Sequence, residues 1–318
     1  MSRWRALLTT AWLGPLVVLL LVYALFTALS PETFARGLNL ITMLRQTVVV
    51  GTAAVGMALI IVLGGIDLSV GSAVALTTVI VARALRAGMG PMEAALAGLA
   101  IATLAGFLNG TLTAALRITP FIVTLGTMSV LRGAAKGLAD EQKIDADPRG
   151  LDHLMNIVPT GAIVMPPAGA WIALGAAACG AITLSYTRFG RHIVAVGSNE
   201  LTARLCGVPV NRVRVLVYTL GGLLAGIAGV LEFATLTVGD PTDSFGLELE
   251  AIAAVVIGGG SLSGGQGSVA GTLIGALLLS VIKAGCTHVG LPNWVQEILT
   301  GVIIVVAMGV DRLRQRAR

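Results

Sequence analysis

The sequence has little charge, few aromatic residues and very few cysteines and histidines. Of its 318 residues, 12% are charged, 4% are aromatic and 56% are hydrophobic. An average soluble domain carries roughly 25% charged residues, so this chain cannot cover the surface of a soluble protein of its size. Lipid is therefore the expected solvent for much of the chain, and the sequence predicts an integral membrane protein.

The few cysteines and histidines exclude several classes of site. Cys179, Cys206 and Cys286 lie far apart and lack metal-ligand spacing, which argues against a disulfide framework and a thiolate metal site. The three histidines fall in expected loops and are not paired with acidic residues at helical spacing. We therefore expect no catalytic residue and no metal site, and an intramembrane enzyme is disfavoured.

The positive charge is confined to a few places. The formal net charge is +5, and the arginines gather near the N-terminus, between Arg188 and Arg214, and at the C-terminus. This distribution is typical of cytoplasmic loops attracted to anionic lipid. Because no aromatic residues are interleaved with the arginines, we expect membrane lipid rather than nucleic acid as the partner of these segments.

Long apolar runs predict an all-α, polytopic protein with about ten transmembrane helices. The run at 11–29 is long enough to span and lacks a small-residue cleavage site, so we interpret it as a retained helix and not a signal peptide. Residues 37–46 are expected to form a short helix before the second span, and 250–257 is too short to cross alone. The expected spans are 11–29, 47–63, 70–85, 91–116, 120–136, 167–187, 213–233, 250–257, 269–282 and 294–310.

Ten crossings place both termini on one side, and their arginines predict that this side is the cytoplasm. The acidic connection after the fifth span is then external and the basic one after the sixth is cytoplasmic, whereas Arg83 and Arg86 disagree with the rule. The expected organisation is one membrane domain over 1–318, with N-terminal helices 11–136, an external connection 139–166, a sixth span 167–187, a cytoplasmic loop 188–212, C-terminal helices 213–310 and a basic tail 311–318.

Two glycine-rich segments interrupt the apolar runs. The first contains Gly64, Gly65, Asp67, Ser69 and Ser72. Backbone groups freed at membrane depth need partners in protein or in a water-filled cavity. Asp67 is either a helix cap in a cytoplasm-facing turn or part of a solute pathway, and a capped half-helix satisfies both interpretations.

The second segment, 257–268, resembles the first and includes Gly258, Gly259 and Ser261. A pair of glycine-interrupted segments in the two halves of a chain indicates a binding or transport site. No lysine follows the glycines and no βα unit surrounds them, so a nucleotide-binding loop is rejected.

The basic loop 188–212 contains a short capped helix. Ser198 or Asn199 is the expected cap, Glu200 lies in the first turn and Gly207 ends the helix. Leu201 and Leu205, four residues apart, form a small apolar face. Such a helix suits a groove on a partner protein.

Four blocks in this order resemble the permease subunits of ribose-type ATP-binding-cassette importers of bacteria. They are GGIDLSVGS at 64–72, PFIVTLGTM at 120–128, FGRHIVAVGSNE at 189–200 and EAIAAVVIGG at 250–259. The resemblance covers the chain from about residue 47 onward.

The resemblance implies a non-catalytic, multi-pass subunit of the bacterial cytoplasmic (inner) membrane. It would pair with a second permease and dock on a cytoplasmic ATPase, which would use the ATP and magnesium, so no cofactor is expected here. A periplasmic or lipid-anchored binding protein would deliver a monosaccharide. The expected ATPase-coupling residues are Gly190, Arg191, Gly197, Asn199, Glu200, Ala203, Arg204 and Gly207.

A neutral polyol needs hydroxyl and amide partners along its pathway, and Asn109, Thr124 and Thr127 join the two broken segments as candidates. Within the family, a nucleoside or a sugar-like signalling molecule is an alternative solute. An ion-coupled secondary transporter explains the hydropathy equally well, but it needs buried ion-coupling residues and no cytoplasmic docking helix.

Overall fold

The computed structural model describes residues 13–157, 159–160 and 163–316. The N-terminal arginines and the first two residues of the expected span 11–29 lie outside them. The described helices are α2 (Leu13–Leu29), α3 (Gly37–Val62), α4 (Val70–Arg86), α5 (Pro91–Leu116), α6 (Pro120–Leu138), a 3-10 helix η1 (Leu151–Leu154), α7 (Ala168–Tyr186), α8 (Arg188–Ser198), α9 (Glu200–Leu205), α10 (Val210–Leu236), α11 (Leu247–Ile257), α12 (Val269–His288) and α13 (Asn293–Arg316).

Five of the described helices, α3, α5, α7, α10 and α12, are long and apolar enough to cross a membrane, and α2 is a shorter apolar helix. This confirms an all-α membrane protein, whereas the number of crossings stays a prediction. Residues 37–46 do not form a separate helix, since they are the first turns of α3. Residues 38–50 contain no proline or glycine, so no helix-breaking residue divides the helix near residue 46.

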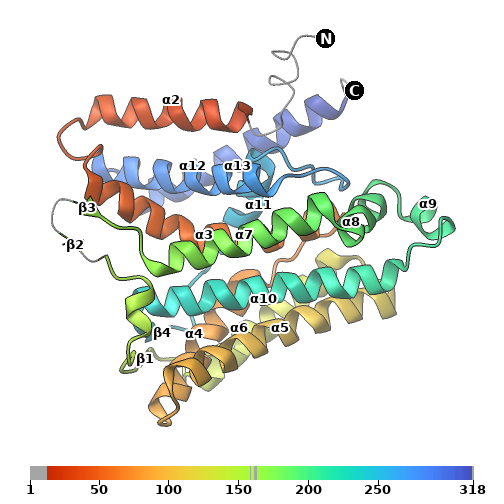
Figure 1. The fold of residues 1–318 in the computed structure, drawn as a ribbon, viewed down its shortest axis with the longest axis horizontal. Coiled ribbons are helices and arrows are strands. Elements are labelled where there is room, and N and C mark those ends of the chain that lie inside the picture. The colour runs from red at the N-terminus through yellow and green to blue at the C-terminus, as the bar shows by residue number, and fades with distance from the viewer. Residues whose placement is uncertain (1–12, 158, 161–162, 317–318) are drawn as a thin grey trace.

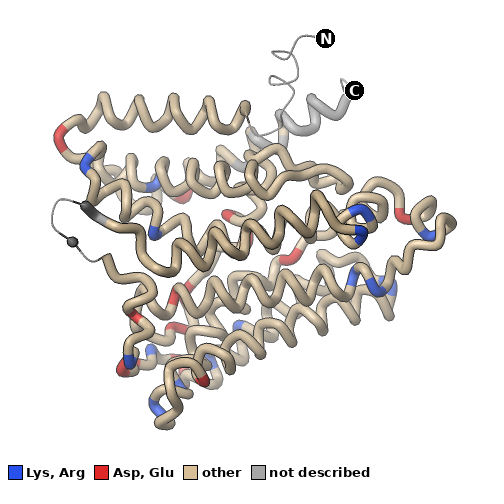
Figure 2. Tube along the Cα trace, viewed as in Figure 1, with Lys and Arg blue, Asp and Glu red and all other residues tan. Residues whose placement is uncertain are grey.

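The long helices lie side by side along the longest dimension of the molecule (Figure 1). Helices α8 and α9 lie at one end, and the short strands and η1 lie at the other. Lys, Arg, Asp and Glu gather mainly at these two ends, with few along the middle of the helices (Figure 2). This is the charge distribution that a bilayer imposes on a bundle of spanning helices.

Helix α3 occupies the centre of the bundle, and residues 51–63 are all buried. It packs against α7, α10, α11 and α12. Small residues allow the neighbouring helices to approach closely. A Cβ atom on Gly106 of α5 would overlap the carbonyl oxygen of Tyr218 in α10 and lie 2.9 Å from the Cα of Gly222. Close backbone approach at small residues is typical of helix pairs in membranes.

The end opposite α8 and α9 is tied together by short strands and arginines. Strand β1 (Ile144–Asp145) pairs antiparallel with β4 (Val238–Gly239), and β2 (Pro159–Thr160) pairs with β3 (Ile163–Val164). Lys143 forms an ion pair with Asp240 at 3.0 Å. The expected external connection is therefore anchored to the segment that follows α10.

Arg83, which disagrees with the charge rule, donates a hydrogen bond to the carbonyl of Leu138. Partial burial alone would raise the pKa of Asp240, but hydrogen bonds from Thr242 and Lys143 and the lysine charge lower it below its ordinary value. Arg83 and Asp240 are thus both partnered within the chain.

Candidate functional site: a glycine junction and a polar cleft

The first broken segment joins the end of α3 to the start of α4. The backbone N–H of Gly64 donates to Ile61 and that of Gly65 donates to Ile60, which closes α3. Gly64 has a φ of +89°, a conformation that only glycine adopts readily. A Cβ atom on Gly65 would lie 2.5 Å from the hydroxyl oxygen of Tyr218. The chain therefore turns here under close packing from α10.

Asp67 belongs to a buried hydrogen-bond network. Its Oδ1 accepts from the backbone N–H of Ser69 at 2.8 Å and from the Ser69 hydroxyl at 2.6 Å. The Ser69 oxygen in turn accepts from Nδ2 of Asn109 on α5 at 2.8 Å. All three side chains are at most 2% exposed. In this conformation Asp67 stabilises the start of α4, and its carboxylate is not open to a solute.

The remaining candidates around this segment are also held by the protein. Thr124 on α6 and Tyr218 on α10 both donate to the carbonyl of Ile66, at 3.2 and 3.3 Å. Thr127 bonds within its own helix, to the carbonyl of Thr124. Ser72 is 1% exposed, and its hydroxyl has no hydrogen-bond partner among the described residues. In this conformation Thr124 and Tyr218 hold the backbone of the break, and the pathway role expected of these polar residues stays a prediction.

The second broken segment forms a closed loop between α11 and α12. The backbone N–H of Ser261 donates to Gln266, and that of Gly264 donates to Ser261, both at 3.0 Å. Ser268 caps α12 by accepting from Gly271 N–H at 3.3 Å. A Cβ atom on Gly258 would overlap the backbone of Gly271. Gly259 follows Gly258 in the same turn.

The two broken segments meet each other and the end of α8. The N–H of Gly265 donates to the carbonyl of Val62 at 2.8 Å. A Cβ atom on Gly264 would lie 2.9 Å from the Cα of Gly64 and 2.7 Å from the carbonyl oxygen of Gly197. We call Gly64, Gly197, Gly264 and Gly265 the glycine junction. It brings together two sets of residues that the sequence predicted separately.

The predicted capped helix in the loop 188–212 is confirmed as α9. Asn199 accepts from the N–H of Thr202 at 2.9 Å, and Gly207 ends the helix with a φ of +82°. Ala203 is 4% exposed and anchors α9, whereas Leu201 and Leu205 are 69% and 80% exposed. The small apolar face therefore has no cover in the described part of the chain.

Glu200 links α9 to α10. Its carboxylate pairs with Arg204 at 3.0 Å and with Arg214 at 2.7 Å. Partial burial alone would raise the pKa of Glu200, but the charge and hydrogen bond of Arg214, followed by those of Arg204, lower it below its ordinary value. These pairs connect α9 to the start of α10.

Helix α8 was missed by the sequence analysis, which expected a loop there. Thr187 caps it by accepting from Gly190 N–H at 3.0 Å. Ile193 and Val196 are buried and Arg191 is exposed. The three-residue spacing of the buried positions from Gly190 onward is a helical signal that was available in the sequence.

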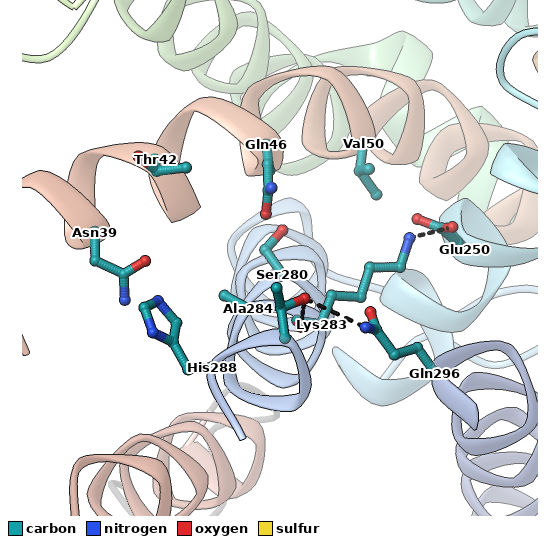
Figure 3. A pocket seen from close by; sticks show the side chains of 11 residues that line it. Asn39, Thr42, Gln46, Val50, Glu250, Ser280, Lys283, Ala284, His288 and Gln296 are labelled. Carbon is teal, nitrogen blue, oxygen red and sulfur yellow. Dashed lines mark hydrogen bonds and ion pairs between the residues drawn. The ribbon is translucent and has the colours of Figure 1, made fainter. Parts of the chain in front are cut away.

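A polar cleft lies in the half of α3 remote from the glycine junction. It consists of two adjoining cavities of about 430 and 440 Å³, which share Thr42, Gln46, Val50 and Glu250. In Figure 3, Gln46 points from α3 toward Ser280 and Lys283, and Lys283 extends to Glu250. The lysine Nζ lies 2.5 Å from Glu250 Oε1. The cleft is open. Polar residues predominate among those that line the first cavity, whereas the second also contains Val49, Phe245 and Leu247.

The sequence alone did not predict this cleft. Lys283 and Glu232 are charges near the ends of expected spans. In the structure Lys283 of α12 is paired with Glu250 of α11, and Glu232 lines the second cavity. The available signal was polar residues at helical spacing within apolar runs, such as Asn39, Thr42 and Gln46.

Among the described residues, no group of three or more His, Cys, Asp or Glu side chains could hold a metal ion. Interrupted helices and an open cleft with polar side chains within a helical membrane protein are typical of a solute permease. The chain belongs to the family described as branched-chain amino acid transport system / permease component, whose model matches residues 39–308.

Relatives match almost the whole chain. It is 39% identical to the ribose import permease protein RbsC of Escherichia coli (strain K12), over 98% of each chain. It is 37% identical to the protein of the same name from Bacillus subtilis (strain 168), over 94% of this chain and 92% of the relative. It is 33% identical to the fructose import permease protein FrcC of Rhizobium meliloti, over 94% and 84%. No solved structure matches the chain.

Proposed function

We propose that this chain is the transmembrane permease subunit of an ATP-binding-cassette importer for a monosaccharide. The observation that carries the proposal is the similarity to ribose import permeases over 98% of both chains. The chain itself is non-catalytic, and a separate ATPase subunit hydrolyses ATP with magnesium. Its place is the bacterial cytoplasmic (inner) membrane.

The arrangement of the helices supports an even number of crossings, such as the expected ten, with both termini in the cytoplasm. Helix α2 begins, and α13 ends, on the side that faces toward α8 and α9 along the bundle (Figure 1). The arginine-rich segment 188–214 marks this end as cytoplasmic by its charge. The whole chain is then one permease domain, with 139–166 as the external connection and 188–212 as the coupling segment.

We assign the ATPase-docking role to α8 and α9. Leu201 and Leu205 offer two exposed apolar anchors, and the ion pairs of Glu200 hold α9 rigidly against α10. A partner that binds α9 would therefore move α9 together with the start of α10. An ATPase groove that receives a short helix fits these features.

The glycine junction offers a short route from this body to the broken segments. Gly197 lies in the last turn of α8. Its carbonyl lies against Gly264, and the N–H of Gly265 donates a hydrogen bond to Val62 at the end of α3. A movement of α8 would be transmitted to both broken segments directly through these backbone contacts. It would not have to be transmitted along α7 or α10, the helices that flank α8 and α9 in the chain. Packed backbone elements shift as units between discrete arrangements, which suits rocking between outward-open and inward-open states.

A complete importer would contain a second permease, an ATPase at one copy per permease and a solute-binding protein. The test is co-expression of the tagged permease with its neighbouring genes, purification in detergent, and uptake assays in proteoliposomes with ribose and fructose. We expect an ATPase to co-purify and uptake to require ATP and binding protein. Uptake driven by an ion gradient without ATP would overturn the proposal in favour of a secondary transporter.

A further inference from the structure

Two polar stripes face each other across the cleft. Asn39, Thr42 and Gln46 lie at positions i, i+3 and i+7 of α3, and Ser280, Lys283 and Thr287 repeat this spacing on α12. All six line the same cavity. Residues at this spacing share one face of a helix, and the two helices pack together. Each helix therefore directs a row of hydrogen-bonding groups into one space.

The charges in the cleft are balanced. Lys283 is paired with Glu250, and in the second cavity Arg45 faces the same space as Glu232 and donates to the carbonyl of Thr235 at 3.1 Å. A charged ligand would meet no net opposite charge from these side chains. Hydroxyls, amides and ion pairs instead offer donors and acceptors to a neutral polar molecule.

The size and lining of the cleft also limit the ligand. Small-molecule sites commonly enclose roughly 300–1,000 Å³, and the first cavity, of about 430 Å³, lies in this range. Only Val50 and Ala284 among the lining residues of this first cavity are apolar, whereas the second cavity also contains Val49, Phe245 and Leu247. In the first cavity a branched aliphatic side chain would lie against polar groups and leave them without partners, which costs affinity. Several hydroxyl groups would satisfy them.

We propose that this cleft is the outward-facing site for a neutral polyhydroxylated solute of monosaccharide size, with Gln46 as a direct ligand. The inference rests on the proposed function and names the residues of its pathway. Gln46 is exposed and lies where the two cavities adjoin. About 16 residues of α3 separate Gln46 from Val62, which corresponds to about 24 Å along the helix. The solute therefore occupies this site well before it reaches the glycine junction.

The experiment uses the assembled importer in proteoliposomes with binding protein and ribose. Gln46→Leu removes the amide at similar size and should reduce ATP-driven ribose uptake at least ten-fold, while stimulation of ATPase activity by loaded binding protein is retained. Gln46→Asn keeps the amide and should recover part of the uptake. Gln142→Leu, the same change at an exposed position outside this cleft, should leave uptake unchanged.

A labelling measurement makes the proposal independent of transport rates. In a background of Cys179→Ser, Cys206→Ser and Cys286→Ala, the Gln46→Cys variant should react with an impermeant thiol reagent added outside spheroplasts, and reaction should block uptake. The Thr124→Cys variant, at a buried position, should not react. If wild-type uptake is ATP-driven but the Gln46→Cys variant is unreactive, or Gln46→Leu transports normally, this cleft is not the site although the importer stands. If the wild type moves no sugar with ATP, both proposals fail.

Discussion

The two ends of α3 differ in how closely the chain packs around them. At its C-terminal end three segments meet so closely that a Cβ atom on Gly197 or on Gly264 would overlap neighbouring backbone. At its N-terminal half, Gln46 and Thr42 project into a cleft whose two cavities hold about 430 and 440 Å³. One end is closed by backbone against backbone, and the other is open, with the polar side chains of two helices facing its first cavity. A transporter with one closed and one open end is in an outward-facing arrangement under our proposed topology.

The largest effect is expected from breaking the closed end. In Gly197→Ala, the added methyl group would overlap the carbonyl oxygen of Val62 and lie 2.6 Å from the nitrogen of Gly265. Backbone cannot move aside as a flexible side chain can, so the cost should reach or exceed the roughly 1–3 kcal/mol typical of overpacking. We expect loss of ATP-driven uptake and a lower thermal unfolding midpoint in detergent.

Gly133→Ala is the matched control, because a Cβ atom there meets nothing within 4 Å. Alanine in a helix interior is favoured over glycine by about 0.5–1 kcal/mol, so this variant should be neutral or slightly more stable. Equal stability and uptake for the two variants would show that the glycine junction is not tightly closed.

The second-largest effect is expected from changes to the surface of α9 that is proposed to bind the ATPase. Leu201→Glu with Leu205→Glu places two charges on the exposed face of α9, and we expect ATPase co-purification to fall at least ten-fold with the permease still folded. Thr202→Glu adds the same type of charge to an exposed position of this helix and should retain the ATPase. Normal co-purification of the double variant would remove the docking role from α9.

A smaller effect is expected from the open end. Lys283→Met leaves Glu250 without its partner at 2.5 Å. Breaking a fully buried pair costs about 3–5 kcal/mol and an exposed pair about 0–1 kcal/mol. The two side chains are 37% and 18% exposed, so a cost of about 1–3 kcal/mol is expected.

The double variant Lys283→Met with Glu250→Gln removes both charges and should recover most of this stability. The measurement is the thermal unfolding midpoint of the purified permease. If the double variant were no more stable than Lys283→Met, the ion pair would not be the origin of the effect.

The sequence predicted the closed end well and the open end poorly. Glycine clusters at 64–65 and 258–260 break helices by a local rule, and Asn199 with Gly207 marks the ends of α9 by another. Both rules act within a few residues, so a single sequence shows them. That Gly197 contacts Gly64 and Gly264 depends on the packing of α8 against two distant segments, and no local pattern indicates it.

The cleft required knowledge of which helices face each other. Lys283 and Glu250 lie 33 residues apart, and each alone is a charge near the end of an expected span. Lys283 and Glu250 form an ion pair beside Gln46 only because α11 packs against α12. Asn39, Thr42 and Gln46 did carry a readable helical spacing, and counting polar residues by helical face would have identified half of the cleft.

The smallest expected effect tests how strongly the ion pairs of Glu200 hold α9 in place at the closed end. The pKa of Glu200 is lowered in the folded protein, chiefly by Arg214 acting against partial burial. A group with a lowered pKa contributes stability above its ordinary value of about 4.3, and this contribution is lost as pH falls through the folded-state pKa. Glu200→Gln removes the charge at the same size. Because the Glu200 side chain is 44% exposed, the difference should stay below about 1 kcal/mol.

The measurement is hydrogen exchange of the amides of residues 200–207 in wild type and Glu200→Gln at matched pH, so that intrinsic exchange rates cancel. We expect about two- to five-fold faster exchange in the variant at pH 7, which corresponds to about 0.4–1 kcal/mol. Below the folded-state pKa the wild-type carboxylate is also neutral, so the two proteins should converge. A difference that persisted unchanged into acid would mean that the Glu200 side chain holds α9 by packing, and that the arginine pairs do not orient the helix which the ATPase is proposed to grip.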